Sequence, residues 1–441
     1  MKRLLPRAAA LLAVGSIALF AVLVVVSRRL DTPEFRTALL GRVKTALGTD
    51  VRVRKMDVSL LSGVQLEGVG ISNPAPFQGD ILTADEFVFR YRLLPLLAGR
   101  IAVDRVALRR PVMTIAVDSH GVYNFERLGS DSGSAPSGAY RGAALPFALE
   151  LSRLSVDDGR VSFRDARRAT LLTMEGMDLA SSLDLLSGGA TGRGKVAIAR
   201  LVLASGVAVT ELRAPLEISG GRATLAPVGG RLAGGEVTGR VVVNLASARF
   251  TSEIELRNVD LKALAGEARS RPGFSGRLGA KAKVEGSGGV ATLKGGGTAQ
   301  VERCRVEESR LFALIAAAVQ VPELNHPDLD ECRVEFTLGG GFLRTPVLRA
   351  KGPSLALSGR GSVSLVTANL DYQMTLALAS KLLDRIRVNE LRAAFRDRGD
   401  GFSTLDFNVS GTTSEPKTDL AARLAKAAVG SKLWRLFDRV R

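Results

Sequence analysis

The side chains that could perform chemistry are few and scattered along this chain. His120 and His326, the two histidines, have no Cys or His neighbour at a metal-ligand spacing, which favours surface or loop positions for both. The glycines 295–297 follow Lys294 and do not precede a Lys-Ser or Lys-Thr pair, so they do not form a phosphate-binding loop. The chain also lacks the Gly-x-Ser-x-Gly elbow of a serine hydrolase. We therefore identify no catalytic, cofactor-binding or metal-binding residue.

Carboxylate pairs give no candidate acid and base either. Asp157 and Asp158 are adjacent in the sequence, and so are Glu307 and Glu308. Adjacent residues on a strand point to opposite faces, so such pairs do not converge on one substrate. We expect a protein that is not an enzyme and that uses no cofactor.

Two cysteines, Cys304 and Cys332, each open the same four residues, Cys-Arg-Val-Glu, at the start of an expected strand. If those strands are neighbours, a disulfide is sterically possible, and an exported compartment would permit it. The alternative is two free, buried thiols. Nothing in the sequence sets the distance between the two sulfur atoms.

The composition is basic, with a formal net charge of +17. Arg and Lys are interleaved with Asp and Glu along the whole chain, which favours a generally Arg-rich surface, with attraction to anionic lipid as the alternative. No helix-turn-helix, zinc or aromatic-basic signature accompanies this charge, so we expect no nucleic-acid partner.

The elements that position these residues begin with a membrane anchor. Lys2, Arg3 and Arg7 precede a run from Ala8 to Val26 that is apolar apart from one Gly and one Ser. This run has about the length of roughly 20 residues that a helix needs to cross a bilayer. It ends without a good small-x-small cleavage site, which favours an uncleaved anchor in residues 8–27. The basic N-terminus then stays in the cytoplasm, and the rest of the chain lies in the periplasm of a single-pass inner-membrane protein.

A short helix and then many strands follow the anchor. Thr32 is a plausible N-cap, Pro33 occupies the first helical position, and Gly48 ends the helix. From Val51 onward the apolar residues alternate with polar ones, as in strands with one wet face. Residues 129–145 are rich in Gly, Ser and Ala, which indicates a flexible linker or a long loop. We divide the chain into residues 1–29 (cytoplasmic tip and anchor), 30–128 (β region), 129–145 (linker), 146–418 (second β-rich region) and 419–441 (C-terminal helix).

Alternation is clear in two neighbouring segments of the second β-rich region. Val241 and Val243 alternate with Arg240, Val242 and Asn244, and Ile254 and Leu256 alternate with Glu253 and Glu255. Val241, Val243, Ile254 and Leu256 are our candidates for the lining of a hydrophobic groove. A long succession of such strands predicts an extended antiparallel sheet with one apolar face.

The C-terminal helix is basic and amphipathic. Its apolar face carries Leu433, Leu436 and Phe437, and between Arg423 and Arg441 six basic residues outnumber the single acid, Asp438. It also carries the one Trp of the chain. Such a helix suits an anionic membrane interface, whereas the alternative is that it packs on the last strands and covers a sheet edge. The candidate membrane-contact residues are Lys432, Leu433, Trp434, Arg435, Leu436 and Phe437.

Three stretches together resemble the AsmA family. The first is the anchor, the short helix and the strands that lead to Ile71-Ser-Asn-Pro74. The second runs from Ile101 to Leu128 and contains Pro111 and then Gly121-Val-Tyr-Asn124-Phe125, in which Gly121 and Asn124 are turn residues that close a hairpin. The third, residues 304–418, is similar to the family's C-terminal region. Pro111, Gly121, Asn124 and Phe125 are therefore read as a structural motif.

The resemblance implies a mainly β protein in which an N-terminal transmembrane helix precedes an elongated, curved antiparallel sheet, an open trough with a few short amphipathic helices. It also implies a non-enzymatic function in envelope biogenesis, namely binding or transfer of phospholipid or another envelope lipid through the hydrophobic groove. The alternative is a scaffold or assembly factor for outer-membrane proteins that transports nothing. The expected partners are the inner membrane through residues 8–27, a lipid, and an outer-membrane or periplasmic protein.

Overall fold

A computed structural model describes residues 33–427, except 60–62, 93–100, 130–148, 166–168, 187–188, 246, 248, 270–272, 288–289, 308–311, 314–315, 318–320, 385–391, 393 and 414. The predicted anchor, residues 8–27, lies outside the described residues. Within the described part of the chain, no helix is both long enough and apolar enough to cross a membrane.

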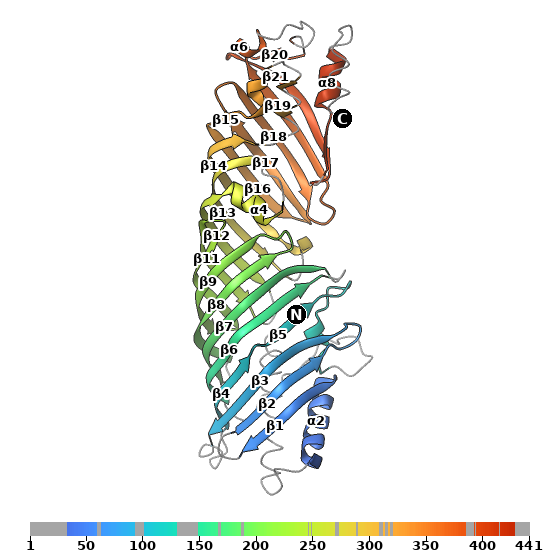
Figure 1. Ribbon diagram of the computed structural model, residues 1–441, viewed down its shortest axis with the longest axis vertical. Helices are drawn as coiled ribbons and strands as arrows, with labels where there is room; N and C mark the ends of the chain where they lie inside the picture. The colour runs from blue at the N-terminus through green and yellow to red at the C-terminus, as the bar shows by residue number, and fades with distance from the viewer. Residues whose placement is uncertain are drawn as a thin grey trace. The chain divides into compact units, whose positions relative to one another are not determined.

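The described residues are mainly β, as predicted, with a large mixed sheet and few helices (Figure 1). The chain divides into two compact units. Unit 1 comprises residues 1–231 and 238–251, and unit 2 comprises residues 232–237 and 252–441. The boundary between the units thus lies near residues 232–251. The predicted linker, residues 129–145, falls inside unit 1, where only Gly129 belongs to the described residues.

Unit 1 opens with the helix that the sequence predicts. Helix α2 spans Pro33–Leu47, and Gly48 ends it with a φ of 65° while its N–H donates to the carbonyl of Lys44 at 2.8 Å. Strand β1 (Val51–Ser59) pairs with β2 (Gly63–Ser72), β2 with β3 (Asp80–Arg92), and β3 with both β4 (Ile101–Arg109) and β5 (Val112–Ala116), all antiparallel. The 3-10 helix η1 follows at Asn124–Arg127.

The next strand corrects the prediction of a purely antiparallel sheet. Strand β6 (Leu149–Arg164) pairs in parallel with β4 through its first half and with β5 through its second half. Parallel neighbours need a connection of a dozen residues or more to bring the chain back to the same end of the sheet. Residues 117–148 supply that length, so the sheet is mixed.

The remaining strands of unit 1 run back and forth beside β6. Strand β7 (Thr170–Leu186) pairs antiparallel with β6 and with β8 (Gly189–Leu203), and β8 pairs antiparallel with β9 (Ala208–Ser219). Strand β10 (Arg222–Leu232) is hydrogen-bonded to β9. Strand β11 spans Gly235–Asn244, and most of it belongs to unit 1.

Unit 2 is a second succession of antiparallel strands. Its first elements are β12 (Phe250–Asp260), α4 (Leu261–Glu267), β13 (Phe274–Gly286), η2 (Val290–Thr292) and β14 (Lys294–Val306). Strands β13, β14, β16 (Glu331–Gly339), β17 (Phe342–Lys351), β18 (Leu355–Ser364), β19 (Leu370–Ala379) and β21 (Phe402–Gly411) then pair in that order. Short strands β15 (Asp328–Leu329), β20 (Arg396–Asp397) and β22 (Pro416–Thr418) pair with β14, β21 and β21.

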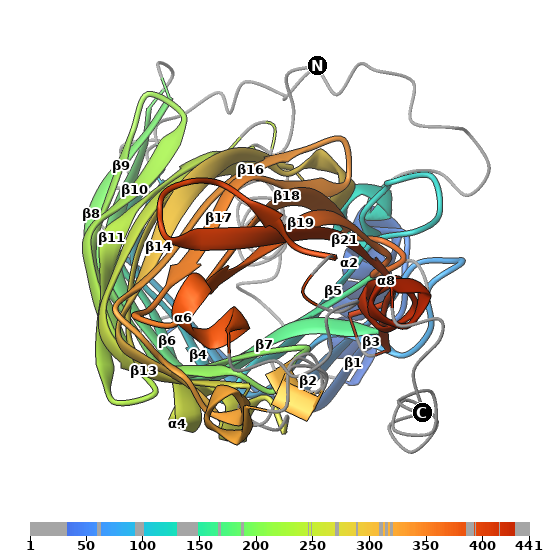
Figure 2. The ribbon, with the colours of Figure 1, turned by 90° about the horizontal axis from the view of Figure 1, so that it is seen from above.

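Helical segments cover the apolar face of unit 2. Leu355, Leu376 and Phe407 project from β18, β19 and β21 into a buried cluster. Further members are Phe312 and residues of the 3-10 helix η3 (Pro322–Asn325), helix α6 (Ser380–Leu383) and helix α8 (Leu420–Ala427), and strands β14, β15 and β17 contribute others. Figure 2 shows α6 on the inner side of the curve that β16–β19 form. This part of the predicted apolar face is therefore a closed core.

Candidate functional site

An apolar face that crosses four strands of unit 1 is the candidate functional site. The strand register places apolar residues of β6, β7, β8 and β9 side by side in rows, with neighbouring strands about 4.8 Å apart. We call this surface the β6–β9 face. Its rows are Val156–Leu179–Val196–Ala214, Gly159–Met177–Ile198–Leu212 and Leu151–Leu183–Gly192–Ile218.

The middle strands of this face are less buried than strands β2–β4 of the same unit. Phe89, Val64 and Val103 of the earlier strands are at most 1% exposed. In contrast, no apolar residue described on β7 or β8 is buried, and Leu179 and Ile198 are half-buried. A contiguous surface of accessible apolar side chains is where apolar ligands or partners bind.

The opposite face of the same strands is polar. Asp178, Ser182, Arg193 and Glu217 alternate with the apolar residues and are exposed. Ser182, Arg193 and Glu217 lie in one cross-strand row. The two-faced strands that the sequence predicts are therefore present in β7–β9, although these were not the strands proposed for the groove.

The four predicted groove residues lie on β11 and β12. Val241 and Val243 of β11 are half-buried members of unit 1, and Leu256 of β12 is half-buried in unit 2. Ile254 is 39% exposed. On β12 the alternation has the predicted sense, because Glu253 pairs with Lys283 at 2.7 Å on the other face. Each pair thus lies on an accessible apolar surface of its own unit.

The predicted structural motif forms a compact polar cluster around Asn124. The Asn124 side chain is fully buried and makes four hydrogen bonds. Its Oδ1 accepts from the N–H groups of Ala116 (3.2 Å) and Phe125 (3.0 Å), and its Nδ2 donates to Thr114 O (2.7 Å) and Asn73 Oδ1 (2.8 Å). Asn124 is therefore more than a turn residue, because it links the two motifs Ile71-Ser-Asn-Pro74 and Gly121-Val-Tyr-Asn124-Phe125.

The residues around Asn124 support this arrangement. Gly121 turns the chain at a φ of 80°, as the sequence predicts. Pro111 is buried between β4 and β5, where its carbonyl accepts from the N–H of Arg160 at 2.7 Å. Phe125 stacks on Tyr123 with ring centroids 5.0 Å apart. These contacts are structural and present no reacting group.

Asp118 ties the same turn together by charge. Its carboxylate accepts from the N–H groups of His120 (2.9 Å) and Val122 (3.0 Å) and from Arg127 Nη2 (2.7 Å). Burial acts to raise the pKa of Asp118, but these hydrogen bonds outweigh it and hold the pKa below the ordinary aspartate value. His120 itself is exposed.

Cys304 and Cys332 are free thiols in contact with each other. Cys304 is 2% exposed, and its strand β14 lies beside β16, which carries Cys332. A hydrogen bond between the thiols lowers the pKa of Cys304, and the same bond with burial raises the pKa of Cys332. The strands are thus neighbours, which was the condition for a possible disulfide, and the structure shows the alternative of two free thiols.

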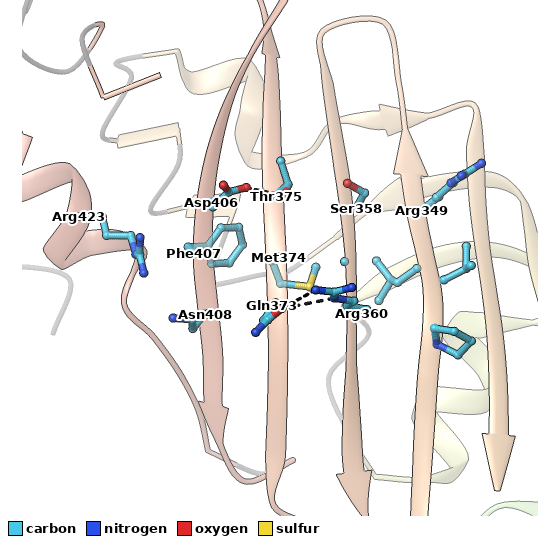
Figure 3. Close-up of a pocket in the computed structure, with 14 residues that line it drawn as sticks. Arg349, Ser358, Arg360, Gln373, Met374, Thr375, Asp406, Phe407, Asn408 and Arg423 are labelled. Atoms are coloured by element: carbon cyan, nitrogen blue, oxygen red, sulfur yellow. Dashed lines mark hydrogen bonds between the residues drawn. The ribbon is translucent and has the colours of Figure 1, made fainter. Parts of the chain in front are cut away.

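A polar pocket of about 530 Å³ lies on β17–β21 of unit 2. Figure 3 shows Arg349, Arg360 and Arg423 around it, with the Thr375 hydroxyl donating to Asp406 at 2.6 Å. Arg423 donates to Asp419 at 2.9 Å, and Arg360 contacts Gln373 at 3.3 Å. Several polar side chains that line the pocket are therefore already hydrogen-bonded to other residues of the chain. The lining contains no nucleophile paired with a base.

The described part of the chain contains no candidate metal site. Among the described residues, no group of three or more His, Cys, Asp or Glu side chains could hold a metal ion. His326 Nδ1 lies 3.3 Å from the carbonyl oxygen of Val306, a contact within the fold of unit 2.

The predicted membrane-contact residues lie outside the described residues, which end at 427. Helix α8, just before them, buries Leu420 and Leu424 in the closed core. Asp419 begins this helix and accepts hydrogen bonds from the N–H and the side-chain amide of Asn408 on β21. Residues 419–427 therefore cover part of β21, as the alternative for the C-terminal helix predicts.

Sequence reasoning missed the β6–β9 face, although a signal was present. Leu179 and Leu183 alternate with Ala180, Ser182 and Asp184, and the pattern is as regular as that around Ile254. It also missed the residues that cover unit 2, because Phe312 and Leu324 come from segments whose short apolar runs do not show which surface they pack on.

Comparison with protein families agrees with these features. Residues 1–198 match the model of the AsmA family, and this region contains both motifs that meet at Asn124. The match confirms the resemblance of the N-terminal part, whereas residues 304–418 lie beyond it. No curated protein sequence and no solved structure matches the chain.

Proposed function

We propose that this chain, in which residues 1–198 belong to the AsmA family, is a non-enzymatic envelope-biogenesis protein that binds or transfers lipid in the periplasm. Residues 8–27 anchor it in the inner membrane. The β6–β9 face receives the acyl chains of a phospholipid or another envelope lipid.

The observation that carries this proposal is the accessibility of β7 and β8. Their described apolar side chains form continuous rows, and none of these side chains is buried. Burial of an acyl chain contributes about 0.8 kcal/mol per CH₂. Contact with several rows can therefore offset much of the cost of drawing an acyl chain out of a bilayer.

The closed core of unit 2 supports the alternative role for that unit. Leu355, Leu376 and Leu378 are at most 1% exposed because the chain's own helices cover them. A unit of this kind acts as a scaffold that positions other envelope proteins, and it does not need to carry lipid.

Site-specific photocrosslinking in intact cells tests the lipid proposal. A photoreactive phenylalanine analogue replaces Leu179 or Ile198 on the β6–β9 face, and a matched control places it at Ala180 or Arg193 on the polar face. We expect lipid adducts by mass spectrometry at the first two positions and none at the controls. Equal labelling at all four positions, or protein adducts alone at Leu179 and Ile198, would show that this face does not hold lipid.

A further inference from the structure

An arginine-rich patch lies on the polar face of β3, β4 and β6 in unit 1. Its members, which we call the arginine cluster, are Arg90 and Arg92 of β3, Arg105 of β4 and Arg153 of β6. Phe89 and Tyr91 alternate with the two β3 arginines and are buried, so Arg90 and Arg92 point to the opposite face. The strand register places Arg90 directly opposite Arg105.

One described carboxylate lies within ion-pair distance of the arginine cluster. Asp104 lies 3.4 Å from Arg92 Nη2 and 3.8 Å from Arg153 Nη2. Among the described side chains, Arg90 and Arg105 have no ion-pair partner. Four arginines and one aspartate therefore leave a local excess of positive charge.

Two acids, Glu86 and Asp157, lie farther along the same face. A depression of about 280 Å³ is lined by Arg90, Arg105, Arg109, Gln65, Glu86 and Asp157, among others. Glu86 accepts from Gln65 at 2.7 Å and lies 3.7 Å from Arg109. Asp157 lies opposite Arg109 in the register of β4 and β6. Among the described cations that line this depression, Arg90 and Arg105 are therefore the ones without an ion pair, whereas Arg109 pairs with Glu86.

Two arginines that lie opposite each other on neighbouring strands destabilise the sheet when no anion lies between them. Side chains at such positions have Cβ atoms roughly 4.5–5.5 Å apart, and like charges there are destabilising. An anion between them removes the repulsion. Guanidinium groups bind phosphate through paired N–H donors in a planar fork, so phosphate matches this geometry better than a monovalent halide does.

We propose that Arg90 and Arg105 bind a phosphate group, with Arg92 and Arg153 adding to its electrostatic attraction. The phosphate belongs either to a phospholipid headgroup at a membrane surface or to a free phosphate or phosphate ester. This site is independent of the proposed acyl-chain binding, because the arginines lie on the polar face of their strands.

The test uses the full chain in dodecyl maltoside micelles, which contain no phosphate, and the double variant Arg90→Gln, Arg105→Gln. The matched control, Arg193→Gln with Arg213→Gln, removes the same charge from exposed arginines elsewhere on the polar face of unit 1. Inorganic phosphate is titrated at constant ionic strength set by chloride. We expect phosphate to raise the melting temperature of the wild type and of the control, and to leave that of the Arg90/Arg105 variant unchanged.

Without phosphate, the Arg90/Arg105 variant should melt at the wild-type temperature or above it, because the substitution removes repulsion. Loss of the phosphate effect in both variants alike would overturn the proposal, since it would reveal attraction to net charge only. A lower melting temperature of the Arg90/Arg105 variant without phosphate would overturn it too, because the arginines would then be structural.

Hydrogen exchange distinguishes the two sources of phosphate. Protection of residues 86–92 and 101–109 by inorganic phosphate in the phosphate-free micelles identifies a free phosphate or ester as a ligand. Protection in phosphatidylglycerol nanodiscs without added phosphate, absent from the Arg90/Arg105 variant, identifies the headgroup. If neither inorganic phosphate nor phosphatidylglycerol nanodiscs protect these residues, the proposed phosphate site is refuted. This holds whatever the crosslinking at Leu179 shows about lipid binding.

Discussion

Replacement of Asn124 by Asp tests whether the buried amide holds the two AsmA motifs together. The two side chains have nearly the same shape, but an ionised carboxylate cannot donate hydrogen bonds. The variant keeps the acceptors for the N–H groups of Ala116 and Phe125. It loses the donors to Thr114 O and Asn73 Oδ1. Asn73 cannot turn its own amide toward the carboxylate without loss of its 2.9 Å bond to Gln78 O.

Asn124→Asp loses stability because Thr114 O and Asn73 Oδ1 are left without a donor and because a charge is buried. Each buried polar group left without a partner costs about 1–3 kcal/mol. Burial of an unpaired charge at this fully buried position adds to that cost. We expect Asn124→Asp to destabilise unit 1 by about 3–6 kcal/mol at pH 7.

The direction in which the stability of Asn124→Asp changes with pH shows whether the buried charge causes the destabilisation. Desolvation raises the pKa of the new carboxyl in the folded state above its unfolded value of about 3.9. Its neutral form, which can donate one hydrogen bond, is therefore favoured in the folded state as the pH falls. The stability gap to the wild type should narrow between pH 7 and pH 4. In Asn124→Leu, the matched variant without a titratable group, the gap should stay constant over this range.

Hydrogen exchange of residues 112–128 in the full chain, with circular dichroism during urea unfolding, measures both gaps. The reasoning would be refuted by Asn124→Asp within about 1 kcal/mol of wild type at pH 7, since that is less than one orphaned group costs. A gap that is equal at pH 7 and pH 4.5 would also refute it.

Three further outcomes are expected. The pKa of Asp118 in the folded state is lower than its ordinary value near 4. The ionised carboxylate therefore stabilises the fold above that ordinary value, and this contribution is lost as the pH falls through the lowered pKa. Asp118→Asn should accordingly make the melting temperature depend less on pH in the acid range. An unchanged pH dependence would contradict this. Leu424→Ala should destabilise unit 2 by about 2–5 kcal/mol in urea unfolding, whereas exposed Ala422→Ser on the same helix should change it by less than about 0.5 kcal/mol. N-terminal sequencing of the membrane-bound protein should find the chain uncleaved, and a mature end at Arg28 would disprove a retained anchor.

The sequence by itself determined the local structure of this protein. The helix from Pro33 to Leu47 is predicted at both ends, because Pro33 and Gly48 have backbone preferences that act within one turn. Alternation predicted strands with two unlike faces, and Gly121 predicted a turn, where the structure has a positive φ. The two AsmA motifs in residues 1–198 were recognisable for the same reason, since their turn residues are close together in the sequence.

Only the tertiary structure decided which residues meet and which surfaces remain accessible. Asn124 bonds to Asn73, 51 residues earlier, and β6 returns parallel to β4, neither of which a local pattern encodes. A period of two identifies an apolar face but not what covers it. Leu376 on β19 and Leu179 on β7 have the same kind of pattern, yet the chain's helices bury the first and leave the second accessible. The segments that cover an apolar face are distant from it in the sequence, so only the folded chain distinguishes a closed core from an accessible apolar surface.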